Sequence, residues 1–158
     1  MKEEELKGLV KMIVEHACAL KDKHMGHNIR YKNAHVNYAC IFSHSEDEYG
    51  ELLDAAANLG DVIKETPTGP LFHITAVKTV SGPLKLLKIR RPDPARKERG
   101  YADFTIPDFP EFEKEYLPKE SFRRMEKKGF YMIELMDPGF DVRAYFSNPP
   151  LDEQIGIG

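Results

Sequence analysis

Hydrophobic positions near the start of the chain repeat with a helical period. From Lys2 to Lys23 the apolar residues fall three or four positions apart, and acidic residues come first and lysines last, which complements a helix dipole. This spacing puts the apolar side chains on one face of a helix. They are Leu6, Leu9, Val10, Ile13, Val14, Ala17 and Leu20. The pattern predicts an N-terminal helix with one buried face.

Two later stretches of the chain repeat one order of elements. Each begins with a β-branched and aromatic run, continues with an acidic amphipathic stretch, and ends with three short β-like runs separated by turns that contain Gly or Pro. The first stretch begins with AHVNYACIF, Ala34 to Phe42, and the second with YADFTI, Tyr101 to Ile106. The repeat predicts two β-α-β-β-β units.

Cap and turn residues place the elements within each unit. Ser45 and Glu48 form a capping-box pattern before the first helix, and Gly60 stands where its C-terminal cap is expected. The second helix is predicted over Phe109 to Leu117. The predicted closing strands are Val62 to Thr66, Leu71 to Val77 and Leu84 to Arg90 in the first unit, and Phe122 to Glu126, Phe130 to Met136 and Phe140 to Phe146 in the second.

Composition is that of one globular chain. The 158 residues are 41% hydrophobic and 31% charged, with a formal net charge of −3. A chain of this length and composition can form a hydrophobic core without disulfide bonds. We expect one domain over 1–158, with an N-terminal helix and connection (1–33), a first unit (34–90), a second unit (100–146) and a tail (147–158). The tail is expected to be a surface extension with Leu151 tucked in.

Net charge and cysteine content indicate which cellular compartment and which partners to expect. A pI near 6.1 gives no general attraction to nucleic acid or to an anionic membrane. No apolar run approaches the roughly 20 residues that cross a bilayer. Cys18 and Cys40 have no paired spacing. We expect a cytoplasmic protein with reduced thiols and no membrane partner.

Positive charge collects between the two units. Such a run is usually a solvated joint, but it also attracts anionic ligands or an RNA backbone. No aromatic platform alternates with it, which disfavours nucleic acid. Arg90 is the member expected to point into a cleft, where it would suit a carboxylate or phosphate. The cluster consists of Lys85, Lys88, Arg90, Arg91, Arg96, Lys97 and Arg99, offset in part by Asp93 and Glu98.

Polar side chains interrupt several predicted strands. Asp103 lies in an apolar and aromatic strand, and Glu134 lies within FYMIELM. A carboxylate in such a place must be paired or hydrogen-bonded, so each is either structural or part of a site. His35 is open to two interpretations as well, a ligand or a strand histidine held by a hydrogen bond. For His73 the structural interpretation is the stronger.

The order of elements resembles that of the vicinal oxygen chelate superfamily, which includes glyoxalase I, extradiol dioxygenases and bleomycin-resistance proteins. The resemblance rests on AHVNYACIF, FTIPDF and MDPGFDVRAYF and covers roughly 34–146. It implies an α+β fold in which paired β-α-β-β-β modules form a curved, partly closed mixed sheet around a cleft. Members of the family often pair their modules between chains, so the resemblance is compatible with a homodimer.

The resemblance also implies a place for a metal ion. Metal-binding members of the family place His or Glu at the start of the first strand of each module and on the closing strands. His35 matches the first position, whereas Tyr101 and Asp103 stand at the corresponding start of the second module. An enzyme of this kind, a lyase, isomerase or oxygenase, would use His35 with Asp103 or Glu134 to hold a divalent ion while a carboxylate moves a proton.

Other functions remain open from the sequence. A metal-free module of the same fold would bind or sequester a small, anionic ligand through Arg90 and Arg143. In either version the cleft would also be lined by Tyr101 and Tyr145. A third hypothesis is a protein-interaction module in which the N-terminal helix docks on a partner.

Overall fold

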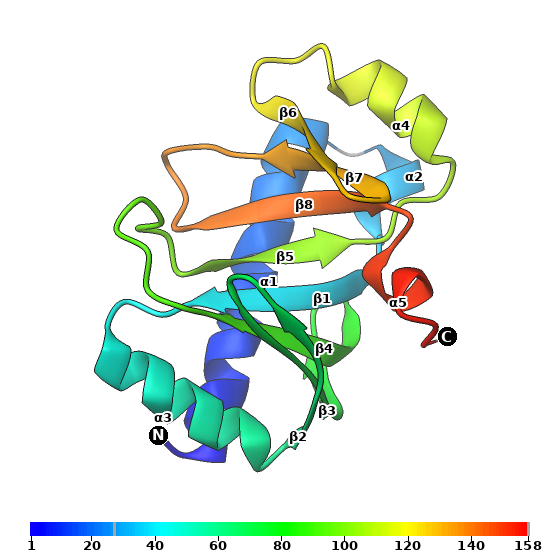
Figure 1. Ribbon diagram of the computed structural model, residues 1–158. Helices are drawn as coiled ribbons and strands as arrows, with labels where there is room; N and C mark the ends of the chain where they lie inside the picture. Colours follow the sequence, from blue (N-terminus) through cyan, green and yellow to red (C-terminus); the bar gives the residue numbers. More distant parts are fainter. Residues whose placement is uncertain (27, 158) are drawn as a thin grey trace.

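The computed structural model describes residues 1–26 and 28–157 and confirms the predicted repeat (Figure 1). The helices are α1 (Glu3–Met25), α2 (Ile29–Lys32), α3 (Glu46–Ala57), α4 (Phe109–Tyr116) and α5 (Leu151–Gln154). The strands are β1 (Val36–Phe42), β2 (Gly60–Thr66), β3 (Gly69–Thr79), β4 (Gly82–Arg90), β5 (Gly100–Phe104), β6 (Phe122–Lys127), β7 (Phe130–Leu135) and β8 (Val142–Asn148). Each unit therefore runs β-α-β-β-β.

All eight strands form one mixed sheet, in the order β2-β3-β4-β1-β5-β8-β7-β6. The first strand of each unit pairs in parallel with the last strand of the same unit, β1 with β4 and β5 with β8. The two units meet where β1 and β5 pair antiparallel. Because β2 and β6 form the two edges, the sheet is not closed into a barrel. The α+β fold with an added N-terminal helix is as predicted.

The two faces of the sheet carry different cores. One face packs against α1, α3 and α4 and holds the larger core. In Figure 1, α1 crosses behind the sheet. Alternate residues point to the other side, which we call the open face, and form a smaller cluster. Its buried members are Tyr38, Cys40, Phe42, Leu71, Leu86, Tyr101, Met132 and Tyr145.

Helix α1 is part of the main core. Its apolar stripe is fully buried, with Leu6, Val10, Ile13, Val14, Ala17 and Leu20 all 0% exposed. Lys21 is also buried, and its amine donates to the carbonyl oxygens of Tyr31 at 3.0 Å and Lys32 at 3.3 Å. The helix thus ties the α2 turn to the sheet. Among the described residues no helix has the length and apolar character of a membrane span.

Two details differ from expectation. Ser45 caps α3 as predicted, accepting from the Glu48 amide at 3.1 Å, but the expected C-terminal cap at Gly60 is wrong. The helix ends at Ala57, and Gly60 is the first residue of β2. A Cβ there would lie 1.9 Å from the carbonyl oxygen of His73, which explains the glycine at this position. The second difference is in the tail, where a surface extension was expected and the structure has the short helix α5. Leu151 is partly buried as expected, and Ile155 and Ile157 also pack against the cluster on the open face.

Candidate functional site: a basic cleft on the open face

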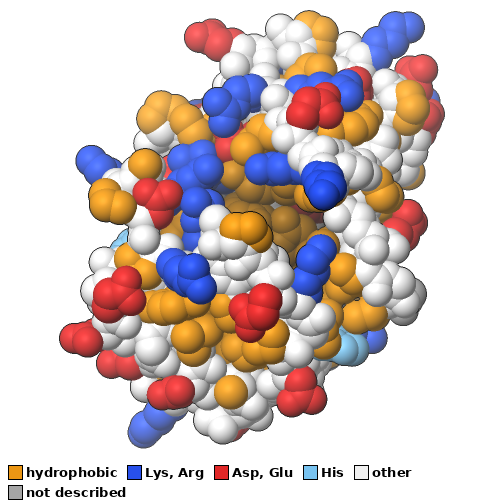
Figure 2. Space-filling view, viewed as in Figure 1, with side chains coloured by type: hydrophobic (Ala, Val, Ile, Leu, Met, Phe, Trp, Pro, Cys, Tyr) orange, Lys and Arg blue, Asp and Glu red, His pale blue; other side chains and the backbone are white. Residues whose placement is uncertain are grey.

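The open face is hollowed, with hydrophobic side chains at the bottom of the hollow and Lys and Arg side chains along its border (Figure 2). Four rings of the buried cluster on this face form what we call the aromatic floor: Tyr38, Phe42, Tyr101 and Tyr145. The ring centroid of Tyr101 lies 5.6 Å from that of Tyr38, 5.8 Å from that of Phe42 and 4.3 Å from that of Tyr145. β1, β5 and β8 supply these rings, so both units build the floor.

The floor hydroxyls remain neutral at physiological pH. The hydroxyls of Tyr38 and Tyr101 are hydrogen-bonded to each other at 2.9 Å. Burial raises the pKa of both phenols well above the usual value. Burial and the nearby Glu134 raise the pKa of Tyr145 to about 12. The floor is therefore a layer of buried, neutral rings whose hydroxyls are hydrogen-bonded within the chain, and it holds no phenolate.

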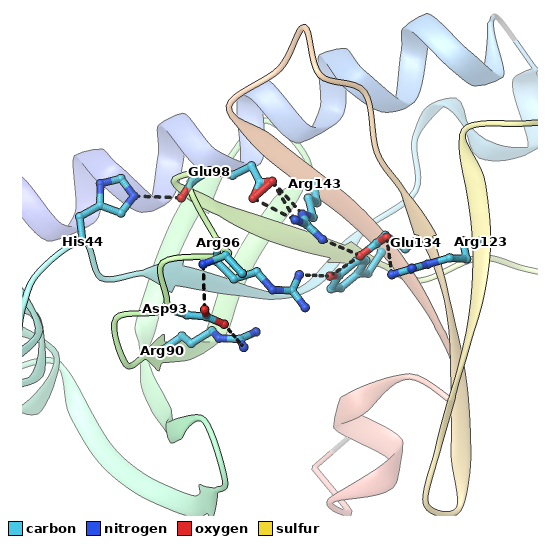
Figure 3. Close-up of polar contacts among 10 residues, drawn as sticks. His44, Arg90, Asp93, Arg96, Glu98, Arg123, Glu134 and Arg143 are labelled. Atoms are coloured by element: carbon cyan, nitrogen blue, oxygen red, sulfur yellow. Dashed lines mark hydrogen bonds and ion pairs between the residues drawn. The ribbon is translucent and has the colours of Figure 1, made fainter.

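Arg90 and Arg96 lie beside the floor. Their guanidinium carbons are 5.6 Å and 5.9 Å from the ring centroid of Phe42, and their side chains run side by side in Figure 3. Arg90 forms an ion pair with Asp93 at 3.2 Å, and Arg96 donates to the Tyr145 hydroxyl at 3.5 Å. A small pocket of about 230 Å³ adjoins Arg90. Arg90 thus lies beside the aromatic floor, and its role as a ligand-binding residue stays a prediction.

Lysines extend this positive border. Lys88 lies on β4 of the open face, between Cys40 and Leu71 on the neighbouring strands. Burial lowers the pKa of its amine, and the positive charges of Arg90, Lys127 and Lys64 lower it further. Cys40 is inert beside it, since burial raises the pKa of the thiol to about 12. We call the following set the basic rim: Lys64, Lys88, Arg90, Arg96 and Lys127.

Glu134 sits in a network of donors rather than free in the cleft. It is 3% exposed, and Oε2 accepts from Arg143 Nη1 at 3.0 Å and from the Tyr145 hydroxyl at 2.8 Å. Its Oε1 accepts from Arg123 at 3.1 Å. Arg143 is held in turn by both carboxylate oxygens of Glu98, at 3.0 Å and 3.1 Å (Figure 3). With three donors engaged, this carboxylate holds Arg143 and Tyr145 in place.

Asp103 is fully buried under the open face. Ser147 donates to its Oδ2, whereas Oδ1 has no partner among the described residues. Burial raises the pKa of the carboxyl well above its usual value, because the ionised form is poorly solvated there. The geometry therefore favours a protonated, structural side chain at this position.

Within the described residues, His35 forms no ion pair with either carboxylate. It is exposed, just before β1, and a Cβ on Gly82 would lie 2.8 Å from its Nδ1. Asp103 and Glu134, by contrast, are buried and bonded to other partners. Over 1–26 and 28–157 no three His, Cys, Asp or Glu side chains form a group that could hold a metal ion. The structure does not bring the predicted metal ligands together.

The structure does bring other predicted residues together. Tyr101, Tyr145, Arg143 and Arg90 all line or border the cleft. The sequence analysis did not single out Tyr38, Phe42, Lys88 or Arg96. The alternation within AHVNYACIF already placed the two aromatic residues on one strand face, and both basic residues lay within the charged cluster. Nothing local in the sequence separated them from the exposed members of that cluster.

Comparison with known proteins supports the architecture alone. No family model matches the chain, and no curated protein matches it. One solved structure, described as "Structural Genomics, Protein EC4020", superposes on it with a TM-score of 0.73 at 11% sequence identity. The superposition covers 97% of this chain and 91% of that chain. At this identity the likeness extends to the fold and not to an activity.

Proposed function

We propose that the chain binds a small anionic molecule with an apolar or aromatic body in the cleft of the open face, and that it does so without a metal ion. The observation that carries the proposal is the basic rim beside the aromatic floor. Within the described residues, the only ion pair made by the five rim cations is that of Arg90 with Asp93. The rim therefore keeps positive charge that a ligand anion can offset.

The chemistry of the two parts suits one kind of ligand. Guanidinium groups bind carboxylate and phosphate through two parallel hydrogen bonds. Neutral tyrosine and phenylalanine rings pack against apolar or aromatic surfaces. Arg90 and Arg96 flank Phe42, so a carboxylate held between them would place the body of the ligand over the floor. An aromatic carboxylate is the simplest molecule with both features.

The paired units support the proposed relationship to the vicinal oxygen chelate superfamily, in which two modules share one cleft. No feature of the cleft favours the metal-dependent version of that proposal. His35 is exposed beside the β3–β4 turn, and Glu134 already accepts from three donors. The binding function rests on Arg90, Arg96 and the floor instead.

Titration with benzoate tests this proposal. We expect benzoate to bind, benzyl alcohol to bind much more weakly, and Arg90→Ala or Arg96→Ala to weaken benzoate binding roughly tenfold. A charge-assisted hydrogen bond contributes about 1.5–3 kcal/mol, and exposure at the rim reduces this toward 1.4 kcal/mol. Isothermal titration calorimetry at fixed ionic strength measures these affinities.

Lys97→Ala is the matched control for this titration. Lys97 lies in the same charged segment and is exposed, so its removal changes the net charge equally without touching the cleft. We expect little change in affinity. If Lys97→Ala weakened binding as much as Arg90→Ala, the attraction would be diffuse, and the proposed site would be wrong.

A further inference from the structure

Lys88 occupies an unusual position for a lysine. Its β-ladder neighbours on either side, Cys40 and Leu71, are both buried, at 0% and 2% exposure. The Lys88 side chain itself is only half-buried. Its amine forms no hydrogen bond or ion pair with any residue in the described part of the chain. Lysines with buried stems usually extend the amine to bulk water or to a carboxylate.

The surroundings of this amine lower its pKa. Partial burial removes water from the ammonium ion, and Arg90, Lys127 and Lys64 add like charge. Burial is the largest effect, and together with the three cations it outweighs an opposing contribution from Cys40, so the pKa of Lys88 is lowered. A lysine with a lowered pKa presents more of the free amine that acts as a nucleophile. The same cations would attract an anionic substrate toward the amine.

We propose that Lys88 is a nucleophilic amine that forms an imine with a small aldehyde or ketone whose carboxylate or phosphate is held by Arg90 and Arg96. This inference rests on the proposed function, since the rim must first bind the anion. It adds a covalent step and a substrate class, anionic carbonyl compounds, to simple binding.

The step balances without any oxidant or reductant. The lone pair of the neutral Lys88 nitrogen attacks the carbonyl carbon, and a proton moves from nitrogen to oxygen to give a carbinolamine. Protonation of that hydroxyl lets it leave as water while the carbon–nitrogen double bond forms, and the nitrogen loses its second proton to solvent. One carbonyl compound and one amine therefore give one imine and one water. Cys40 does not compete, because its thiol is buried and protonated.

Reductive trapping of the imine tests the inference. The protein is incubated with 4-formylbenzoate and cyanoborohydride near neutral pH, and the labelled lysines are identified by peptide mass mapping. We expect Lys88 to carry most of the label at low occupancy. Lys88→Arg should abolish that adduct while keeping the positive charge. Lys85→Arg, which changes an exposed lysine on the same strand, should leave it unchanged.

Two further arms identify the role of the anion. Excess benzoate should protect Lys88, and Arg90→Ala should reduce its labelling roughly tenfold, in parallel with the loss of benzoate affinity. The uncharged 4-methylbenzaldehyde should label Lys88 severalfold less than 4-formylbenzoate does. The map of the wild-type protein is informative even if Lys88→Arg does not fold.

Failure of this inference is distinguishable from failure of the proposed function. If benzoate binds through Arg90 but Lys88 is labelled no more than Lys85, the nucleophile is wrong and the anion site stands. If benzoate does not bind and both aldehydes label Lys88 equally well, the anion-directed chemistry proposed here is overturned, along with the binding function. Selective, benzoate-protected labelling of Lys88 supports both.

Discussion

Replacing Ile13 with Asp is expected to unfold the chain at room temperature. Ile13 is 0% exposed in the middle of the α1 stripe, where its side chain lies near Gly100 at the start of β5. Removing a buried isoleucine costs about 2–5 kcal/mol, and an unpaired carboxylate in the same place adds several more. Such a loss approaches the roughly 5–15 kcal/mol by which domains are stable. Circular dichroism during urea denaturation measures the effect.

Lys11→Asp is the matched control on the same helix. Lys11 is exposed, so the same new side chain is expected to change the free energy of unfolding by less than about 0.5 kcal/mol. A folded Ile13→Asp variant with an unchanged denaturation midpoint would show that α1 is dispensable to the core. That outcome would favour the hypothesis that α1 is a docking helix. In the structure, the apolar stripe of α1 is already used within the chain.

Replacing Glu134 with Ala is expected to lower the free energy of unfolding by about 2 kcal/mol. Removing one partner of a buried ion pair usually costs about 3–5 kcal/mol because the other charge is left uncompensated. Here Glu98 still pairs with Arg143, at 2.9 Å, which reduces the cost. Tyr145 would lose its carboxylate acceptor, so the aromatic floor should loosen as well. Urea denaturation of both proteins at neutral pH provides the comparison.

Two other variants make the Glu134 result specific. Glu126→Ala removes an exposed carboxylate from the adjacent β6, paired with the half-exposed Arg124, and should cost less than about 1 kcal/mol. Glu134→Gln keeps an acceptor and should fall between wild type and Glu134→Ala. Equal stability of Glu134→Ala and wild type would contradict the structural role. It would favour the alternative hypothesis that Glu134 is a catalytic carboxylate or metal ligand.

Much of the fold could be predicted because its signals are local. The stripe of α1, the Ser45 cap and the repeated order of β and α runs each depend on neighbours within a few residues. Gly60 shows the limit of such signals. A glycine after a helix usually marks its cap, but here the reason for glycine is the close approach of His73 on the paired strand. Local sequence does not reveal that approach.

The candidate site could be predicted only in part. The sequence analysis named Arg143 as an anion-binding residue and Tyr101 and Tyr145 as residues lining a cleft, and the structure places the two tyrosines together on the open face. Their partners depend on distant segments, as when Glu98 in the irregular segment between β4 and β5 reaches Arg143 on β8. The surroundings of His35 also depend on more than its own segment. The predicted strand begins at Ala34, whereas β1 begins two residues later, at Val36, and its pairing with β5 shifts between Val36 and Tyr38; His35 is exposed just before this strand.

The central claim is that the open face binds an anion between the basic rim and the aromatic floor. Its most direct test is chemical-shift mapping by nuclear magnetic resonance during titration with benzoate. We expect the largest backbone shifts at Lys88, Arg90, Tyr101 and Tyr145 and in the segment that carries Arg96. Shifts confined to the other pocket, about 540 Å³ and lined by α4 and Tyr131, or no saturable shifts at all, would contradict the account.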